Sequence, residues 1–241
     1  MSKFVYEENE LKISDNCCEF CKNYKINNYN KCFPLECKND NSIFCSKFKK
    51  VDVLIKNIIE LKSENIEEVL TLFYSCFKDD HYYNDFFNKN NIQIQDMCNL
   101  FRSSIEYCIN SGYSIGTIDN YNNLIGFALF FNYNEALLNN YKVFCDIFGA
   151  DENGELSFYT ELHTYIRKLN GETLYLLSIG VDPNLRRNGI ASDMIDYILK
   201  KYNKYNIVSD VSNTNSLSMY SKRNFSIKKL DDAYHLVILK R

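Results

Sequence analysis

The stretch that decides the fold runs from residue 174 to residue 192 and reads LYLLSIGVDPNLRRNGIAS. Residues 174–181 are an almost continuous apolar run of strand length, which is typical of a strand buried on both faces. Pro183 ends this run, because proline cannot donate a hydrogen bond to a sheet. From Ala191 onward apolar residues recur every three or four positions, so the period becomes helical. The sequence therefore predicts a strand, a tight turn and a helix.

The turn at residues 186–192 is predicted to bind an anion. The first amides of a helix lack intrahelical acceptors, and the helix N-terminus carries a partial positive charge. Gly189 has no Cβ, so an anion can come close to the backbone. Arg186 and Arg187 add guanidinium groups and Ser192 adds a hydroxyl. We expect a diphosphate there, and the plain alternative is an ordinary strand, turn and capped helix.

Two motifs of the chain resemble those of the GCN5-related N-acetyltransferases (GNAT). The first is V-x-P-x-x-R-x-x-G-x-A, starting at Val181, which resembles the acetyl-CoA-binding motif of that family. The second, NTNSLSMYSKRNF, resembles the family's N-x-x-A-x-x-x-Y-x-x-x-G-F helix that follows the next strand. Asn224 stands where the family usually has glycine, a mild departure because asparagine tolerates a left-handed backbone. The matching positions of the second motif are Asn213, Ser216, Tyr220 and Phe225.

The resemblance implies an α/β (α+β) fold, with a mixed, mostly antiparallel sheet flanked by helices, over residues 51–241. It also implies direct transfer of an acetyl group from acetyl-CoA to a primary amine in a ternary complex. The fourth strand would bind the pantetheine arm through its backbone, where the fourth and fifth strands separate. The expected coenzyme A contacts are Ile179, Gly180, Val181, Arg186, Arg187, Asn188, Gly189, Ile190, Ala191, Ser192 and Asn213.

Tyr220 is the expected general acid, as the resemblance implies. A phenol with a pKa of about 10 can protonate a departing thiolate; the alternative is that Tyr220 only packs on the sheet. The general base stays open. Some relatives have a glutamate in the fourth strand, where Tyr175 faces the same way here, and Glu161, His163 and Glu172 lie nearby in sequence. A lone histidine in such a segment is more often structural.

The first fifty residues form a predicted cysteine-rich module. Six of the ten cysteines lie between positions 17 and 45, in a stretch with few aliphatic residues that needs a staple to fold. A C-x-x-C pair, Cys18 and Cys21, has the spacing for one tetrahedral zinc ion. Cys32 with Cys45 resembles small bacterial zinc knuckles, and Cys32 with Cys37 is the tighter pair. We expect structural zinc on Cys18, Cys21, Cys32 and Cys45, with unmetallated thiols as the alternative.

Composition excludes several classes of protein. With 46% hydrophobic and 24% charged residues the chain is expected to be globular and soluble. A net charge of −3 argues against nucleic-acid binding, and no apolar run is long enough to cross a membrane. No signal peptide is evident, so we expect a cytoplasmic protein. Its expected partner is an amine acceptor. Two alternatives to the acetyltransferase function stay open: a non-catalytic coenzyme A sensor or docking protein, and an enzyme that transfers another acyl group.

The remaining periodicities predict the other elements of the GNAT-like domain. Ser63 is expected to cap its first helix, and Thr214 the helix that carries Tyr220. An insertion at residues 134–171, with helical patterns at 141–148 and 158–169, is where acceptor specificity is expected. The predicted strands are 51–61, 113–119, 124–133, 206–211, 226–230 and 234–239, and the other predicted helices are 66–77 and 94–109.

Overall fold

The computed structural model describes residues 56–80, 83–84, 87–88, 91–139, 160–230 and 234–241. The residues from Lys56 onward belong to one compact unit, Lys56–Arg241. Within the described ranges, no helix combines the length and the apolar character needed to cross a membrane. The predicted cysteine-rich module, its zinc ligands and the predicted helix at 141–148 lie outside these residues. The predicted domain boundary at residue 50 therefore stays a prediction.

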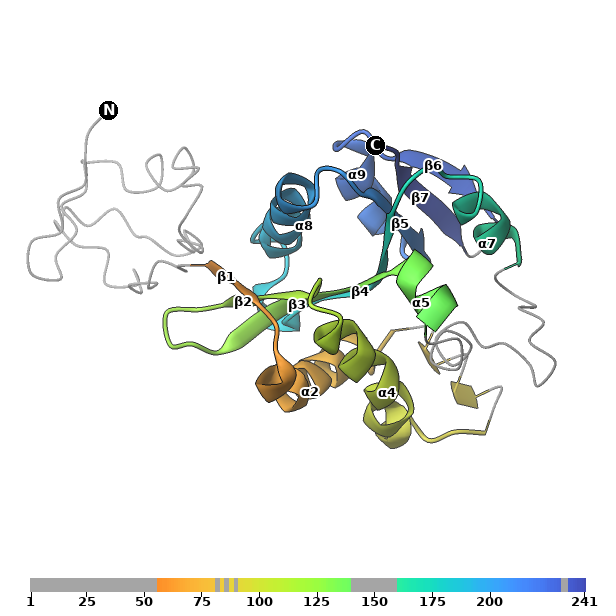
Figure 1. The fold of residues 1–241 in the computed structure, drawn as a ribbon. Coiled ribbons are helices and arrows are strands. Elements are labelled where there is room, and N and C mark those ends of the chain that lie inside the picture. Colours follow the sequence, from red (N-terminus) through yellow and green to blue (C-terminus); the bar gives the residue numbers. More distant parts are fainter. Residues whose placement is uncertain (1–55, 81–82, 85–86, 89–90, 140–159, 231–233) are drawn as a thin grey trace, which may run out of the picture. The chain divides into compact units, whose positions relative to one another are not determined.

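The described residues form a seven-stranded sheet in the order β1-β2-β3-β4-β5-β7-β6 (Figure 1). Neighbouring strands are antiparallel, except that β4 and β5 are parallel. This confirms the mixed, mostly antiparallel sheet expected from the sequence. The strands are β1 (Asn57–Glu60), β2 (Ile115–Ile118), β3 (Leu124–Asn132), β4 (Thr173–Val181), β5 (Asn206–Val211), β6 (Ser226–Lys229) and β7 (His235–Leu239).

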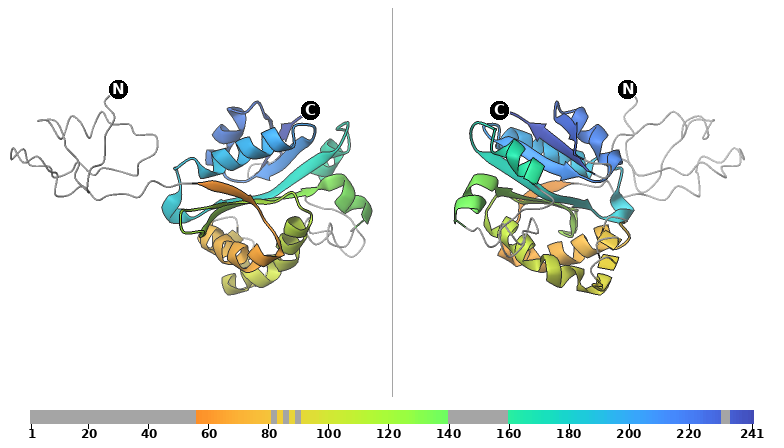
Figure 2. Two further views of the ribbon diagram at one scale, coloured as in Figure 1. Left: turned by 60° about the vertical axis from the view of Figure 1, so that its left-hand side comes forward. Right: turned by 90° about the vertical axis from the view of Figure 1, so that its right-hand side faces the viewer.

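Helices cover both faces of this sheet, as Figure 2 shows. One face carries α2 (Ile66–Phe77) and α4 (Met97–Asn110), and the other carries α8 (Ile190–Lys201) and α9 (Thr214–Ser221). The short helices α5 (Tyr133–Asn139) and α7 (Thr160–Ile166) follow β3 and precede β4, respectively. Each long helix turns one apolar stripe toward the sheet, so β3 and β4 are sandwiched between two apolar layers.

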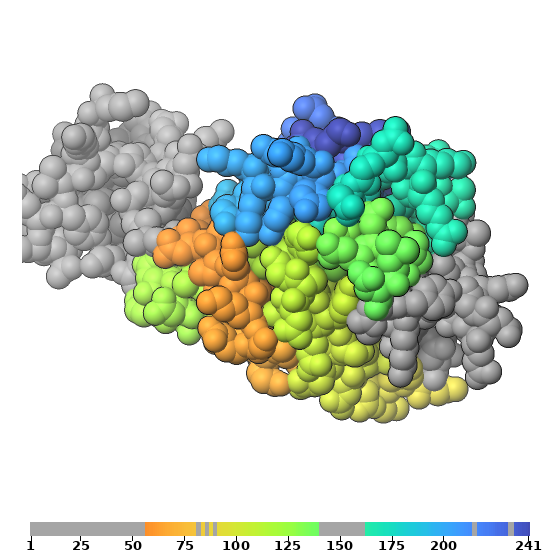
Figure 3. Space-filling view, in the orientation of Figure 1, coloured from red at the N-terminus to blue at the C-terminus, as the bar shows by residue number. Residues whose placement is uncertain are grey.

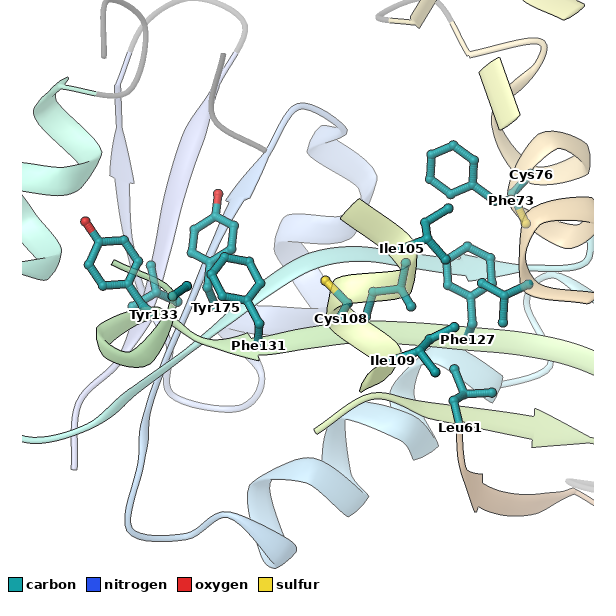
Figure 4. Packing of buried hydrophobic residues seen from close by; sticks show 14 of the residues in the cluster. Leu61, Phe73, Cys76, Ile105, Cys108, Ile109, Phe127, Phe131, Tyr133 and Tyr175 are labelled. Carbon is teal, nitrogen blue, oxygen red and sulfur yellow. The ribbon is translucent and has the colours of Figure 1, made fainter. Parts of the chain in front are cut away.

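Aromatic side chains fill the layer between the sheet and α2. Phe127 of β3 is fully buried, and its ring centroid lies 6.1 Å from that of Phe73 and 6.4 Å from that of Phe77. Figure 4 shows Phe127 and Phe73 together with Ile105 of α4 in this layer. Buried aromatic clusters of this kind are packed like crystals, so they tolerate little added volume.

The start of α2 differs from the prediction. A 3₁₀ turn, Ser63–Asn65, precedes the helix, and the residue that caps α2 is Asn65. The Ser63 hydroxyl instead donates to Oδ1 of Asn110 at 3.0 Å. The prediction of Ser63 as the helix cap was wrong, because the chain tightens one turn before the α-helix begins.

The end of β3 also departs from the expected pattern. The strand stops at Asn132, and α5 begins at the next residue. Oδ1 of Asn132 accepts hydrogen bonds from the amides of Asn134 and Glu135, at 3.0 and 3.2 Å. This side chain satisfies the first amides of α5, so an asparagine inside an apolar run marks the helix start that the sequence analysis missed.

Two turns contain an asparagine with a left-handed backbone. Asn122, between β2 and β3, has φ 64°, and Asn224, after α9, has φ 62°. Asparagine tolerates this conformation, and at Asn224 it agrees with the sequence analysis. The Asp119 carboxylate closes the first turn by accepting the amides of Tyr121 and Asn123.

Gly180→Ala should destabilise the fold. A Cβ at Gly180 would lie 2.5 Å from Cζ of Phe127 and 3.0 Å from Sγ of Cys76. The Phe127 ring is held by the aromatic cluster and cannot move aside, so we expect a loss of about 1–3 kcal/mol in the free energy of unfolding. Urea unfolding measures this loss. Ser178→Ala, which adds no volume to the same strand, is the control, and equal stability of the two variants would contradict the prediction.

His163 should make stability depend on pH. This side chain is 3% exposed, and its Nδ1 lies 2.6 Å from the Tyr133 hydroxyl. Burial, followed by the charge of Arg167, lowers the pKa of His163 to about 4. The unfolded chain, with a histidine pKa of about 6.5, therefore binds more protons between these values, and stability is lost as pH falls from about 6.5 to 4.

We expect His163 to account for up to about 3 kcal/mol of this loss. His163→Gln keeps a side chain that can bond to the Tyr133 hydroxyl but does not titrate. Urea unfolding of both proteins between pH 4 and pH 7 isolates the effect, since other titrating groups are common to both. Parallel pH profiles for the two proteins would show that His163 has no such role.

Candidate active site

The sheet opens between β4 and β5. The two strands pair only at Thr173–Asn206, Leu174–Ile207 and Tyr175–Val208. Beyond Tyr175, β4 is paired with β3 alone in the described part of the chain. The register of β3 and β4 also shifts between Leu129 and Phe130, so Leu177 is left out of the pairing. The separation of the fourth and fifth strands that the family resemblance implied is therefore present, and we call this opening the fork.

The predicted anion-binding turn lies where α8 begins. Gly189 precedes the helix with φ 79°, a left-handed conformation suited to glycine. The first amide of the helix to find a backbone acceptor is that of Asp193, which donates to the Gly189 carbonyl at 2.9 Å. The amides of residues 190–192 have no backbone acceptor within the described ranges. They are the donors that an anion at this end of α8 would need.

Polar side chains hold this turn in place. The Arg186 guanidinium donates to the Cys76 carbonyl at 2.8 Å and to the Val181 carbonyl at 3.4 Å. In this structure it therefore joins the turn to the end of α2. The Asn188 side chain donates to the Leu185 carbonyl at 3.0 Å, which tightens the turn further.

Lys56 brings a cation to the turn from the far end of the described sequence. Its Nζ donates to the Asn188 carbonyl at 2.8 Å and pairs with the Asp193 carboxylate at 2.6 Å. A Cβ placed on Gly189 would lie 3.7 Å from this Nζ. Figure 3 shows the orange surface around β1 directly beside the blue surface of α8. Lys56 was not predicted as part of the site, since no spacing in the sequence connects it with the turn.

Tyr220 lies on α9, against the fork. Its side chain is 2% exposed, and its ring packs edge-on against Phe225 with the centroids 5.2 Å apart. Burial raises the pKa of Tyr220, contact with the Ser209 hydroxyl lowers it, and the charge of Asp210 raises it again. The net shift is upward, so the phenol keeps its proton at neutral pH. Ser209 itself donates to the Leu176 carbonyl at 2.9 Å, at the point where β4 and β5 separate.

Arg223 fixes α9 to α8. Its Nε and one terminal nitrogen donate to the two carboxylate oxygens of Asp196, at 2.6 and 2.7 Å. The other terminal nitrogen donates to the Met219 carbonyl at 2.9 Å. A two-pronged arginine–carboxylate pair restricts orientation as well as distance. The helix that carries Tyr220 is therefore held firmly against the helix that begins at the anion-binding turn.

The other face of the fork holds a second phenol. The Tyr175 hydroxyl donates to Oδ1 of Asp210, and the Tyr175 ring is 1% exposed beside Phe131. Figure 4 shows the Tyr175 hydroxyl pointing away from the strand that carries Phe131. Tyr175 stands where the resemblance would place a base, but Asp210 was not predicted. The available signal was that Asp210 is the only charged residue of β5.

The other side chains considered near this site have different surroundings. His163 contacts the Tyr133 hydroxyl. The Glu172 carboxylate accepts a hydrogen bond from the side-chain amide of Asn132 at 2.8 Å. The side chain of Glu161 lies outside the described part. Asn213 lies between β5 and α9, and its carbonyl accepts a hydrogen bond from the backbone N–H of Ser216 at 2.9 Å. No group of three or more potential metal ligands occurs among the described residues, and the cysteines predicted to bind zinc are not among these.

Comparison with known proteins identifies the family. The sequence model of the Acetyltransferase (GNAT) family matches residues 66–225. The chain belongs to the GNAT family. This GNAT protein is therefore an acyltransferase, and the matched range contains both the turn at Gly189 and Tyr220. A search of curated proteins found no match.

Solved structures share the GNAT fold of this chain at low sequence identity. Polyamine N-acetyltransferase of Drosophila melanogaster is 9% identical, with a TM-score of 0.58 over 78% of this chain and 100% of that one. Arylalkylamine N-acetyltransferase 2 of Aedes aegypti is 16% identical, with a TM-score of 0.56 over 76% of this chain and 96% of that one. An agmatine N-acetyltransferase is 8% identical, with a TM-score of 0.58 over 76% of this chain and 98% of that one. At these identities the likeness establishes the fold.

Gly189→Ala should weaken binding of coenzyme A by about tenfold or more. A side chain at φ 79° costs roughly 1–2 kcal/mol, and relief of this strain would turn the amides of residues 190–192 away from the diphosphate. Calorimetric titration with coenzyme A measures the affinity. Gly112→Ala is a matched control, since Gly112 also has φ 79° but lies in the turn after α4, with open space around it. Equal affinities of the two variants would contradict this role of the turn.

Proposed function

We propose that this protein transfers an acetyl group from acetyl-CoA to a primary amine, with both substrates bound together. The observation that carries the proposal is the continuity of the site. The unpaired edge of β4 leads from the fork toward the turn at Gly189, while Tyr220 flanks the fork. The N-acetyltransferases of polyamines and arylalkylamines that share the fold support an amine as the acceptor.

The residues around the turn would hold the diphosphate of coenzyme A. The amides of Ile190, Ala191 and Ser192 point their N–H groups beyond the start of α8, and Gly189 leaves room for close approach. Lys56 adds a cation beside Gly189, where it also pairs with the Asp193 carboxylate. When bound, acetyl-CoA supplies the activated acetyl group as a thioester. Backbone groups on the unpaired edge of Ile179, Gly180 and Val181 would align its pantetheine arm by hydrogen bonds.

Positioning would supply much of the rate. A site that holds the thioester and the amine in contact converts a bimolecular reaction into one within a complex, which can lower the barrier by about 7–11 kcal/mol in favourable cases. The fork is suited to this task because β3, with its buried aromatic layer, fixes the direction of β4. The strand that would orient the donor is thus supported along its other edge by β3, which is buried over almost its whole length.

Tyr220 would act as the general acid. Its raised pKa keeps the hydroxyl protonated, so it can donate that proton to the sulfur atom of the departing thiolate. Arg223 and Asp196 hold α9 in place, which keeps the hydroxyl directed at the fork. Burial of Tyr220 also limits competition from water for this proton.

The proposal is tested by measuring thiol release from acetyl-CoA with a panel of amines that includes agmatine and an arylalkylamine. We expect amine-dependent release, and a fall in kcat of about 100-fold for Tyr220→Phe, with unchanged affinity for coenzyme A. Tyr107→Phe removes a phenol hydroxyl from α4 and is the matched control. Near-normal turnover of Tyr220→Phe would leave Tyr220 with a packing role alone. Coenzyme A binding without release for any amine would contradict the proposed function.

A further inference from the structure

The Asp210 carboxylate lacks a cationic partner among the described residues, although it is partly buried in the sheet. Its one side-chain partner in this part of the chain is the neutral phenol of Tyr175. Several exposed carboxylates elsewhere in the described residues are paired with a lysine or an arginine. Those pairs are Lys56–Asp193, Arg102–Glu67, Lys201–Glu60 and Arg223–Asp196.

Even partial burial of a carboxylate without a counter-charge is costly, because it removes some of the water that would otherwise stabilise the anion. Burial raises the pKa of Asp210, while the hydrogen bond from Tyr175 lowers it. The net upward shift makes this carboxylate a better proton acceptor than an exposed one. Such a group, next to the opening where substrates would meet, fits a role in binding or catalysis better than a role in stability.

Asp210 and Tyr220 approach the fork from opposite faces of the sheet. Neighbouring residues of a strand point to opposite faces, so Asp210 and Ser209 diverge. Asp210 pairs with Leu236, which belongs with Tyr175 to the buried cluster on the α2 and α4 face. Ser209 contacts Tyr220 on the face covered by α8 and α9 (Figure 2). An acid and a carboxylate thus flank one gap, immediately beyond the last β4–β5 pair.

We propose that Asp210 binds the ammonium group of the acceptor and takes a proton from it, on the α2 and α4 face of the fork, with Tyr175 as its positioning residue. This inference rests on the proposed function. The acceptor ammonium is the counter-charge that the described residues do not give Asp210. Because the Tyr175 hydroxyl donates to Oδ1, it leaves Oδ2 for the acceptor nitrogen.

The proton balance of this role is complete. Asp210 removes one proton from the ammonium group, and the nitrogen lone pair then forms the new C–N bond. The C–S bond breaks, and Tyr220 gives its proton to the sulfur. The second proton lost by the nitrogen replaces the one that Tyr220 gave, and the proton on Asp210 passes to solvent. The products are the amide, the thiol of coenzyme A and one proton.

Asp210→Asn tests the inference. Asparagine keeps an oxygen that can accept the Tyr175 hydroxyl, but it can neither take a proton nor balance an ammonium group. We expect kcat/KM for alkylamines to fall by about 100-fold or more. We expect the affinity for coenzyme A to stay the same and the unfolding temperature to stay the same or rise, since a buried charge is removed. Glu67→Gln, which removes an exposed carboxylate on α2, is the control.

The same measurements separate this role from others. A structural role of Asp210 would lower the unfolding temperature together with activity, which would overturn the inference. So would a loss of less than about tenfold in kcat/KM. Tyr175→Phe, which keeps the ring but releases Oδ1, should raise KM for the amine more than it lowers kcat. If the native chain acetylates amines and Asp210→Asn matches it, only this inference fails; if the native chain acetylates none, the proposed function fails with it.

Discussion

The arrangement of the site depends on one feature of the sheet: the parallel strands β4 and β5 stop pairing after three residue pairs. β4 and β5 share hydrogen bonds only as far as Tyr175 and Val208, and beyond that point each strand must satisfy its backbone in another way. β4 continues against β3, and β5 against β7. The Ser209 hydroxyl donates a hydrogen bond to the Leu176 carbonyl at the point where the two strands separate. The unpaired groups further along β4 are thereby concentrated on one edge, where a ligand with amide groups can complete the sheet.

The two faces of the sheet give this opening two different chemical environments. On one side α9 carries the buried phenol of Tyr220. The two hydrogen bonds from Arg223 to Asp196 hold α9 against α8. On the other side a carboxylate is bound by a tyrosine that belongs to the aromatic core. Strand alternation at Ser209 and Asp210 is enough to produce this division. Neither face needs a flexible loop to bring its reactive group to the fork.

Local patterns in the sequence predicted much of this arrangement. The apolar run, the proline and the change to helical period defined β4, the turn and α8, because each depends on neighbouring residues. The positive φ angles at Asn122 and Asn224 were predictable for the same reason. The contacts of Lys56, Asp210 and the Arg186 guanidinium were not, since they join residues far apart in the chain. The prediction of Ser63 as the helix cap was wrong, because the sequence pattern did not distinguish a serine cap from a 3₁₀ turn that precedes the helix.

Arg186 also connects the anion-binding turn with α2. Its backbone belongs to the turn before α8, but its guanidinium donates to the carbonyl of Cys76 in the last turn of α2. An adjustment of the turn around a ligand would therefore be transmitted to the end of α2. With the acceptor on the α2 and α4 face of the fork, as proposed above, occupancy of either site would change the free energy of binding at the other, and this linkage is reciprocal. The two substrates would bind cooperatively and not independently.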